Sequence, residues 1–173
     1  MRRLAADEAS RLVDDTVSAL HVRHRGCVMC AIASGEHDPE LVVQRSDAGV
    51  IVVDRFAATR GHVMVVLPEH VEHVARLEWE RYAALQRLAW EAARALDVLL
   101  KPRRIFVAAL GASALLSKTF PHLHLHVVPV YEDGEQSRPA NVFSWSHGVW
   151  VYEEGEGAAL ASDLRLRMHA PVP

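Results

Sequence analysis

Apolar residues follow two different periods along this chain of 173 residues. Residues 41–45, 50–54 and 61–68 are rich in Val, Ile and Leu, and short segments with turn-forming residues separate them. Such runs are typical of β-strands joined by turns. Residues 104–110 and 119–130 have a similar character, so the sequence predicts about five strands.

The second period is that of an α-helix. Apolar side chains recur at helical intervals over residues 3–20 and, in the longest pattern, over residues 71–100, which Pro102 ends. Residues 158–168 favour a last helix. Because short turns join most of the strands and one helix crosses between them, we expect an α+β fold, an antiparallel sheet of about five strands with a long crossover helix.

Composition narrows the class of protein. Half of the residues are hydrophobic and 24% are charged, as in ordinary soluble proteins, and the net charge of −3 gives no basic surface for nucleic acid. No apolar run approaches the ~20 residues that cross a bilayer. The basic residues 1–3 are followed by acidic Asp7 and Glu8 and by no apolar signal segment. We therefore expect a cytoplasmic protein with neither nucleic-acid nor membrane partners.

The fifth predicted strand contains three histidines in strict alternation: His122, His124 and His126 flank Leu123 and Leu125. Alternate residues of a strand point to one face, with about 7 Å between neighbouring Cα atoms. The leucines point the other way and anchor the strand to a core. Crowded imidazoles gain nothing for folding, so the row indicates chemistry, either a metal site or nucleophilic catalysis by an oriented imidazole.

Cys27 and Cys30 are the two cysteines of the chain and form a Cys-x-x-Cys pair. In a cytosolic protein such a pair is more often a metal half-site or a redox pair than a structural disulfide. A redox pair is expected in a βαβ context, whereas hairpin strands are predicted to follow this one. Taken alone, the pair leaves both interpretations open.

The motif His-φ-His-φ-His-φ-φ, in which φ is apolar, resembles the signature of the histidine-triad (HIT) superfamily of nucleotide hydrolases and transferases. The resemblance runs from about residue 27 to residue 130. It implies a HIT-like domain over residues 26–132, an N-terminal helical extension over 1–25, and a C-terminal segment over 133–173 that packs on the domain or on a dimer partner. The matching positions outside the triad are Cys27, Cys30, Ile32, Gly35, Glu36, Asp54, Gly61, His62, Pro68 and His70.

In zinc-containing members of the superfamily, two cysteines and two histidines hold the metal. By resemblance these are Cys27, Cys30, His70 and His122, with His73 as a competing candidate for the place of His70. Two thiolates and two imidazoles complete a tetrahedron with no open position, so the implied zinc is structural.

The resemblance also assigns catalytic and substrate-binding roles. His124 is the expected nucleophile, which attacks the α-phosphorus of a nucleoside 5′-phosphate conjugate and forms a nucleotidyl-histidine. His126 is expected to donate a hydrogen bond to the α-phosphate, and His62 to complete the histidine cluster. Asp54 is expected to accept from the ribose hydroxyls, and its alternative role is to cap a turn. The implied substrates are phosphoramidates or dinucleoside polyphosphates, and the implied assembly is a homodimer.

The loop before the triad departs from the superfamily pattern. Gly111 stands where an Asn is usual, and Ser117-Lys118-Thr119 replaces Gly-Gln-Thr, so that Thr119 alone matches. We hypothesise that Lys118 replaces the lost amide as a point-charge donor to a phosphate, the alternative being a solvated lysine. The altered loop leaves two other functions open: a non-catalytic nucleotide-binding module, and a catalytic metal site on all three triad histidines.

Overall fold

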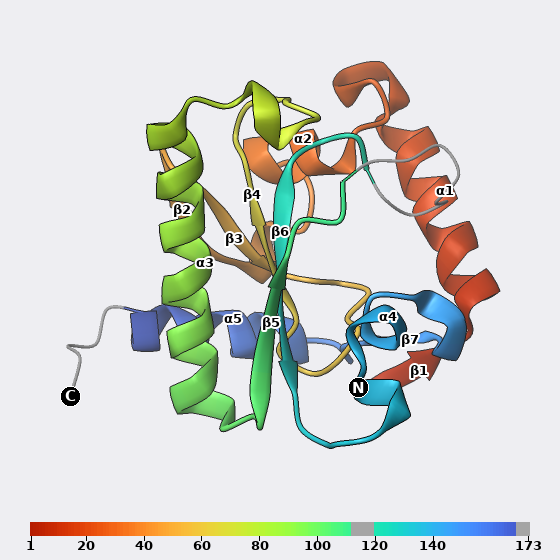
Figure 1. The fold of residues 1–173 in the computed structure, drawn as a ribbon. Coiled ribbons are helices and arrows are strands. Elements are labelled where there is room, and N and C mark those ends of the chain that lie inside the picture. Colours follow the sequence, from red (N-terminus) through yellow and green to blue (C-terminus); the bar gives the residue numbers. More distant parts are fainter. Residues whose placement is uncertain (112–119, 169–173) are drawn as a thin grey trace.

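The computed structural model describes residues 1–111 and 120–168. Its main sheet has five strands in the order β2-β3-β4-β6-β5, and each pair of neighbours is antiparallel. The predicted α+β fold with an antiparallel sheet of about five strands is confirmed (Figure 1). The strands are β2 (Val42–Ser46), β3 (Gly49–Val53), β4 (Val63–Val66), β5 (Arg104–Ala108) and β6 (His124–Val130).

Two helices, α3 and α5, pack against each other and against one face of this sheet. Leu85 of α3 and Leu164 of α5 are buried in one core cluster with Leu123, Leu125 and Val127, which lie in and just before β6. The leucines that alternate with the histidines therefore anchor the strand, as the sequence predicts. The helices are α1 (Ala6–His24), α2 (Val28–Ser34), α3 (Trp79–Leu100), α4 (Pro139–Val142) and α5 (Glu156–Met168), and the 3₁₀ turns are Pro39–Leu41, Val74–Arg76, Glu135–Ser137 and Trp145–His147.

The other face of the sheet carries the polar side chains. His124 and His126 project from it, since they alternate with the buried Leu125 and Val127 along β6. Helix α2 contacts β3 and β4, and α1 contacts α2. In Figure 1, α1 runs along the side of the sheet opposite to α3. The imidazoles therefore lie between the sheet and the N-terminal helices.

Helix α2 was not predicted from the sequence. Its apolar residues Met29 and Ile32 are buried on one side, and the left-handed backbone of Gly35, with φ +87°, ends it. Cys27 is the N-cap residue, and its sulfur accepts a hydrogen bond from the amide of Cys30 at 3.4 Å. The period is hard to see in a helix of 7 residues, because two turns offer few repeats.

Two boundaries differ from the sequence predictions. The long helix begins at Trp79 instead of residue 71, since the preceding residues form only the 3₁₀ turn Val74–Arg76 and the carbonyl of Val71 accepts from the amide of Leu123 at 2.6 Å. Strand β6 begins at His124, because the amide of His122 turns back to the carbonyl of Phe120 at 2.7 Å. His122 therefore stands just outside the strand that holds the other two triad histidines.

A strand near the N-terminus pairs with a strand of the C-terminal segment. Strand β1 (Arg2–Leu4) lies antiparallel to β7 (Val149–Val151), and Leu4 is buried with Ala9 and Val149 against Phe56 and Trp145. The predicted N-terminal helix therefore exists as α1 and packs on the rest of the chain. Within the described residues, no helix has the length and hydropathy needed to cross a membrane.

Candidate functional site

A cavity of about 630 Å³ lies in front of the histidine face of the sheet. Its volume is in the range of about 300–1,000 Å³ that is usual for small-molecule sites. His62, His124 and His126 lie on its wall together with Asp54 at the end of β3. Apolar side chains supply much of the remaining wall, including Val13 of α1, Met29 and Ile32 of α2, and Phe143 and Trp145 of the C-terminal segment.

His124 is held in one orientation by the backbone. Its Nδ1 atom lies 2.7 Å from the carbonyl oxygen of His122. Because a carbonyl oxygen can only accept, Nδ1 carries the proton and Nε2 keeps its lone pair. The ring is 8% exposed, and burial lowers the pKa of His124 although the hydrogen bond acts in the opposite direction. His124 is therefore a neutral imidazole with a defined unprotonated nitrogen.

His62 and His126 form a second pair beside it. Nε2 of His62 lies 3.0 Å from Nδ1 of His126, and the ring centroids of His124 and His126 are 4.8 Å apart in an edge-on arrangement. Burial lowers the pKa of His62 to about 3 and holds that of His126 well below its usual value, and repulsion between the imidazoles adds to both. All three rings are therefore neutral at physiological pH.

Asp54 follows β3 and connects to this pair. Its Oδ1 accepts from the amide of Phe56 at 2.9 Å, which is the turn cap considered from the sequence, and its Oδ2 lies 3.2 Å from Nδ1 of His62. Burial raises the pKa of Asp54 to about 7, while the Phe56 amide lowers it and nearby Asp38 raises it further. Asp54 therefore touches the histidine cluster as well as lining the cavity.

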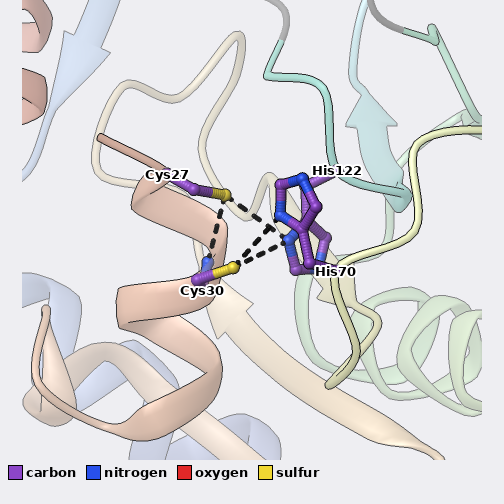
Figure 2. Close-up of side chains that lie close together, drawn as sticks. All are labelled: Cys27, Cys30, His70 and His122. Atoms are coloured by element: carbon purple, nitrogen blue, oxygen red, sulfur yellow. Dashed lines mark hydrogen bonds between the residues drawn. The ribbon is translucent and has the colours of Figure 1, made fainter. Parts of the chain in front are cut away.

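Four other side chains lie together in a separate group: Cys27, Cys30, His70 and His122 (Figure 2). Their candidate ligand atoms all lie within 4.8 Å of one another. Nδ1 of His122 is 3.5 Å from the Cys27 sulfur and 3.4 Å from the Cys30 sulfur, and Nδ1 of His70 is 3.2 Å from the Cys30 sulfur. In a tetrahedron with Zn–S ~2.3 Å and Zn–N ~2.05 Å, sulfur and nitrogen are about 3.6 Å apart. The four side chains therefore fit a zinc ion.

The tautomer of His122 also suits a metal. Its Nε2 lies 2.7 Å from the carbonyl oxygen of Leu67, which places the proton there and leaves Nδ1 unprotonated toward the sulfurs. Burial, together with the neighbouring Cys27, raises the pKa of the Cys30 thiol to about 12. A cation stabilises the thiolate against both effects. His73 is outside the group and half exposed beside Glu72, so His70 is the histidine that stands with the cysteines.

The histidine row is therefore divided between two sites. The ring of His122 faces the two cysteines, while His124 and His126 line the cavity. The sequence predicted that all three histidines lie on one face of the strand. The structure differs because His122 precedes the strand. A metal ion held jointly by all three triad histidines does not fit this division.

The predicted substrate-binding residues and the residues that line the cavity are not the same set. Lys118, hypothesised to donate to a phosphate, and Thr119, the matching loop residue expected to bind substrate, lie outside the described residues. Sequence reasoning missed the walls formed by α1 and by the C-terminal segment, which include Val13, Phe143 and Trp145. Helical periodicity in α1 indicated an apolar face, but nothing in it showed which surface that face meets.

Fold and site together define an α+β protein of the histidine-triad type, with buried imidazoles between a sheet and a ligand-sized cavity. The family model described as the HIT domain matches residues 36–133, and the chain belongs to this family. It is 29% identical over 110 residues to an uncharacterized HIT-like protein of Mycoplasma genitalium, an alignment that covers 63% of this chain and 76% of the relative. A HIT-like protein of Mycoplasma pneumoniae is 30% identical over 112 residues, with coverage of 64% and 76%.

Solved structures of the same family are similar. A zinc-bound histidine-triad family protein from Mycobacterium smegmatis superimposes with a TM-score of 0.63 at 25% identity, covering 82% of this chain and 92% of that one. A HIT-like protein from Bartonella henselae gives a TM-score of 0.66 at 18% identity, covering 82% and 95%. At that lower identity the similarity concerns the fold. Membership of the family establishes a scaffold of the nucleotide-binding, hydrolase type.

Proposed function

We propose that this protein is a nucleotidyl hydrolase or transferase that cleaves at the α-phosphate of a nucleoside 5′-phosphate conjugate. The observation that carries the proposal is the fixed tautomer of His124, whose Nδ1–H donates to the carbonyl of His122. A buried, neutral imidazole with one defined lone pair in a ligand-sized cavity is equipped for nucleophilic attack. A protein that only bound nucleotides would have no need of this arrangement.

In the proposed reaction, Nε2 of His124 attacks the α-phosphorus and the bond to the leaving group breaks. The resulting nucleotidyl-histidine is then transferred to water or another acceptor. His126 donates to the α-phosphate, and His62 supports His126 through their 3.0 Å contact. Oδ1 of Asp54 retains a lone pair beside its bond to the Phe56 amide, and the ribose hydroxyls are proposed to donate to it.

Zinc is proposed as a structural ion held by Cys27, Cys30, His70 and His122. When bound, it supplies a fixed junction, since the donor set leaves no position for water. The ion would join α2 to the segment after β4 and to the residues before β6. The zinc-bound relative from Mycobacterium smegmatis supports this proposal.

A homodimer in the cytoplasm is the proposed assembly. Strand β5 is at the edge of the sheet, and Val107 on it is 45% exposed, which suits pairing with a second copy. Both cysteines are free thiols, as expected in a reducing compartment. Light scattering on purified protein tests the assembly, since a monomeric mass across the working concentration range would contradict it.

Hydrolysis of adenosine 5′-phosphoramidate by the wild type and by His124→Ala tests the proposed reaction. We expect turnover by the wild type and its loss in the variant, with AMP binding retained by both. His73→Ala, at a half-exposed histidine outside both sites, is the matched control and should be fully active. AMP binding without turnover by the wild type itself would instead favour a nucleotide-binding module, an alternative that the altered loop at residues 117–119 supports.

A further inference from the structure

Three side chains, Asp54, His62 and the partly exposed His126, form a continuous hydrogen-bonded series that ends at the cavity. Oδ2 of Asp54 lies 3.2 Å from Nδ1 of His62, and Nε2 of the same ring lies 3.0 Å from Nδ1 of His126. Although the three groups are close enough to be considered for a metal, His62 uses a different ring nitrogen toward each neighbour. Such an arrangement connects the carboxyl group to His126 in series and does not surround a common point.

The backbone indicates where the protons are. The amide of Ala58 donates to Nδ1 of His62 at 3.1 Å, so this nitrogen has a lone pair. The proton of His62 is then on Nε2, which donates to Nδ1 of His126. It follows that His126 carries its own proton on Nε2. Oδ2 of Asp54 approaches an unprotonated nitrogen favourably only when the carboxyl group itself is protonated.

Ionisation of Asp54 reverses both hydrogen bonds between the three side chains, and the amide of Ala58 then loses its acceptor, because Nδ1 of His62 becomes protonated. A carboxylate at Oδ2 accepts from a proton on Nδ1 of His62, whose Nε2 then accepts from a proton on Nδ1 of His126. In that state Nε2 of His126 has a lone pair in place of a proton. The charge on Asp54 therefore determines whether His126 can donate.

We propose that Asp54 is a positioning residue that supplies, through His62, the proton which Nε2 of His126 delivers to the leaving group. The inference rests on the function proposed above. The Nε2 proton of His126 is first donated to the α-phosphate. As the bond from phosphorus to the leaving nitrogen of a phosphoramidate breaks, that nitrogen keeps the electron pair and takes this proton. The proton of His62 Nε2 moves to His126 Nδ1, and the proton of Asp54 Oδ2 moves to His62 Nδ1.

The balance of this step is simple, because the leaving amine gains one proton and Asp54 becomes a carboxylate. In the second half-reaction the attacking water releases a proton to Nε2 of His126, and the same shifts in reverse return Asp54 to the acid form. Neither imidazole becomes an imidazolium ion at the end of either step. This matters because burial lowers the pKa values of His62 and His126 and makes their cations unfavourable.

The surroundings of Asp54 keep it able to change its charge. Asp38 repels its ionised form, and Asp38 is itself paired with Arg55, whose Nε donates to it at 2.9 Å. The Phe56 amide favours the carboxylate, and His62 is the imidazole in direct contact. Two further groups face the series of Asp54, His62 and His126. They are His124, which interacts with His62, and Tyr152, whose hydroxyl accepts from the amide of Gly61. With burial as the largest effect, the pKa of Asp54 is about 7, so both forms are accessible.

Two substrates that differ only in the leaving group test the proposal. Adenosine 5′-phosphoramidate needs a proton on its leaving nitrogen, whereas the 4-nitrophenyl ester of AMP releases a stable anion. For the isosteric Asp54→Asn we expect kcat to fall about 100-fold with the phosphoramidate and about threefold or less with the ester. His62→Gln should show the same contrast, and the double variant should lose no more than either single one.

Equal losses with both substrates would overturn the proposal, because they would mean a general structural role. A loss that vanishes with a 2′,3′-dideoxy phosphoramidate would also overturn it, since Asp54 would then act on the ribose alone. If wild type and His124→Ala are equally inert toward both substrates, the proposed function itself fails, an outcome distinct from a defect confined to Asp54→Asn.

A measurement without substrate examines the hydrogen-bonded series of Asp54, His62 and His126 directly. Nitrogen-15 shifts of labelled histidine report which ring nitrogen is protonated. Below the Asp54 pKa of about 7, we expect both His62 and His126 to carry the proton on Nε2, and above it on Nδ1. Asp54→Asn, checked for an unchanged thermal midpoint, should remain in the first form at all these pH values. Tautomers that do not change across this range in the wild type would overturn the inference.

Discussion

The carbonyl oxygen of His122 lies 2.7 Å from Nδ1 of His124, so the main chain of one residue orients the side chain of the other. The side chain of His122 meanwhile stands with Cys27, Cys30 and His70. The group that fits zinc and the group that lines the cavity are therefore joined through two residues of one segment. A change in the first should reach the second without any direct contact with substrate.

Removal of the metal should lower both stability and turnover. Cys30→Ser takes away one proposed ligand, and loss of an ion present at ~1,000 times its Kd removes about 4 kcal/mol of stability. For a chain of this size the thermal midpoint should fall by about 10 °C. Metal analysis should give one zinc per chain for the wild type and for His73→Ala, and much less for Cys30→Ser. Equal zinc contents in the wild type and Cys30→Ser would contradict the assignment.

The raised pKa of Asp54 predicts a change of stability with pH. A buried carboxyl group whose pKa rises from 3.8 to about 7 stabilises the fold below pH 3.8, and this contribution is lost as the pH rises through 7. The side chain of Asp54→Asn does not ionise. Between pH 4 and pH 8 its free energy of unfolding relative to the wild type should therefore rise by up to about 4 kcal/mol. Urea unfolding at the two pH values measures the difference, and a difference independent of pH would argue against the shift.

His62 predicts the opposite trend. Its pKa falls from 6.5 to about 3 on folding, so its neutral form stabilises the fold above pH 6.5 and this contribution is lost as the pH falls toward 3. The contribution amounts to about 1.4 kcal/mol per pH unit. His62→Gln should therefore lose less stability than the wild type on going from pH 6.5 to pH 4.5. Parallel curves for the two proteins would show that His62 becomes protonated in the folded state.

Asp38 should tune the pH dependence of turnover. Because Asp38 helps to raise the pKa of Asp54, Asp38→Asn should lower that pKa, and Arg55, no longer neutralised by Asp38, should lower it further. The proposed proton donor exists below the Asp54 pKa, so the alkaline limb of the kcat profile should move to lower pH by about one unit. A pH–rate series with the phosphoramidate measures it. A shift to higher pH would exclude Asp54 as the group responsible.

The pairing of β1 with β7 should contribute measurably to stability. Leu4 is 2% exposed beneath Val149 and Ala9, so Leu4→Ala should destabilise the protein by about 2–5 kcal/mol. Leu12 lies in α1 with 42% of its surface exposed, and Leu12→Ala should cost only about 0.5 kcal/mol. Urea unfolding of the two variants checks this contrast, which fails if they are equally stable.

Much of the fold could be predicted from local patterns in the sequence. Alternation at His124 and His126 and the 3.6-residue period of α3 are properties of short segments, so they were visible without tertiary structure. The two cysteines and the two histidines that gather with them also stood at positions indicated by the superfamily pattern. The family and the α+β fold followed from these signals.

Other features depend on contacts between distant residues and were not predictable in this way. Pairing of Leu4 with Val149 joins segments whose individual patterns are too short to indicate a partner. The contact of Asp54 with His62 depends on the turn between β3 and β4, and its effect on proton positions needed the amide of Ala58. Residues before α3 had a helical pattern, but the carbonyl of Val71 bonds to the amide of Leu123, and Val74–Arg76 form only a 3₁₀ turn.

The position of β6 in the sheet has a consequence for the order of folding. It lies between β4 and β5, and its partner in β4 is distant in the chain, since Val66 faces His124. Closing so long a loop is slow relative to forming the β2–β3 and β3–β4 hairpins. A chain that has made only its local hairpins therefore does not yet have His124, the proposed nucleophile, in place. Acquisition of nucleotide binding during refolding should consequently report the insertion of this strand, and should lag behind the first gain of sheet structure.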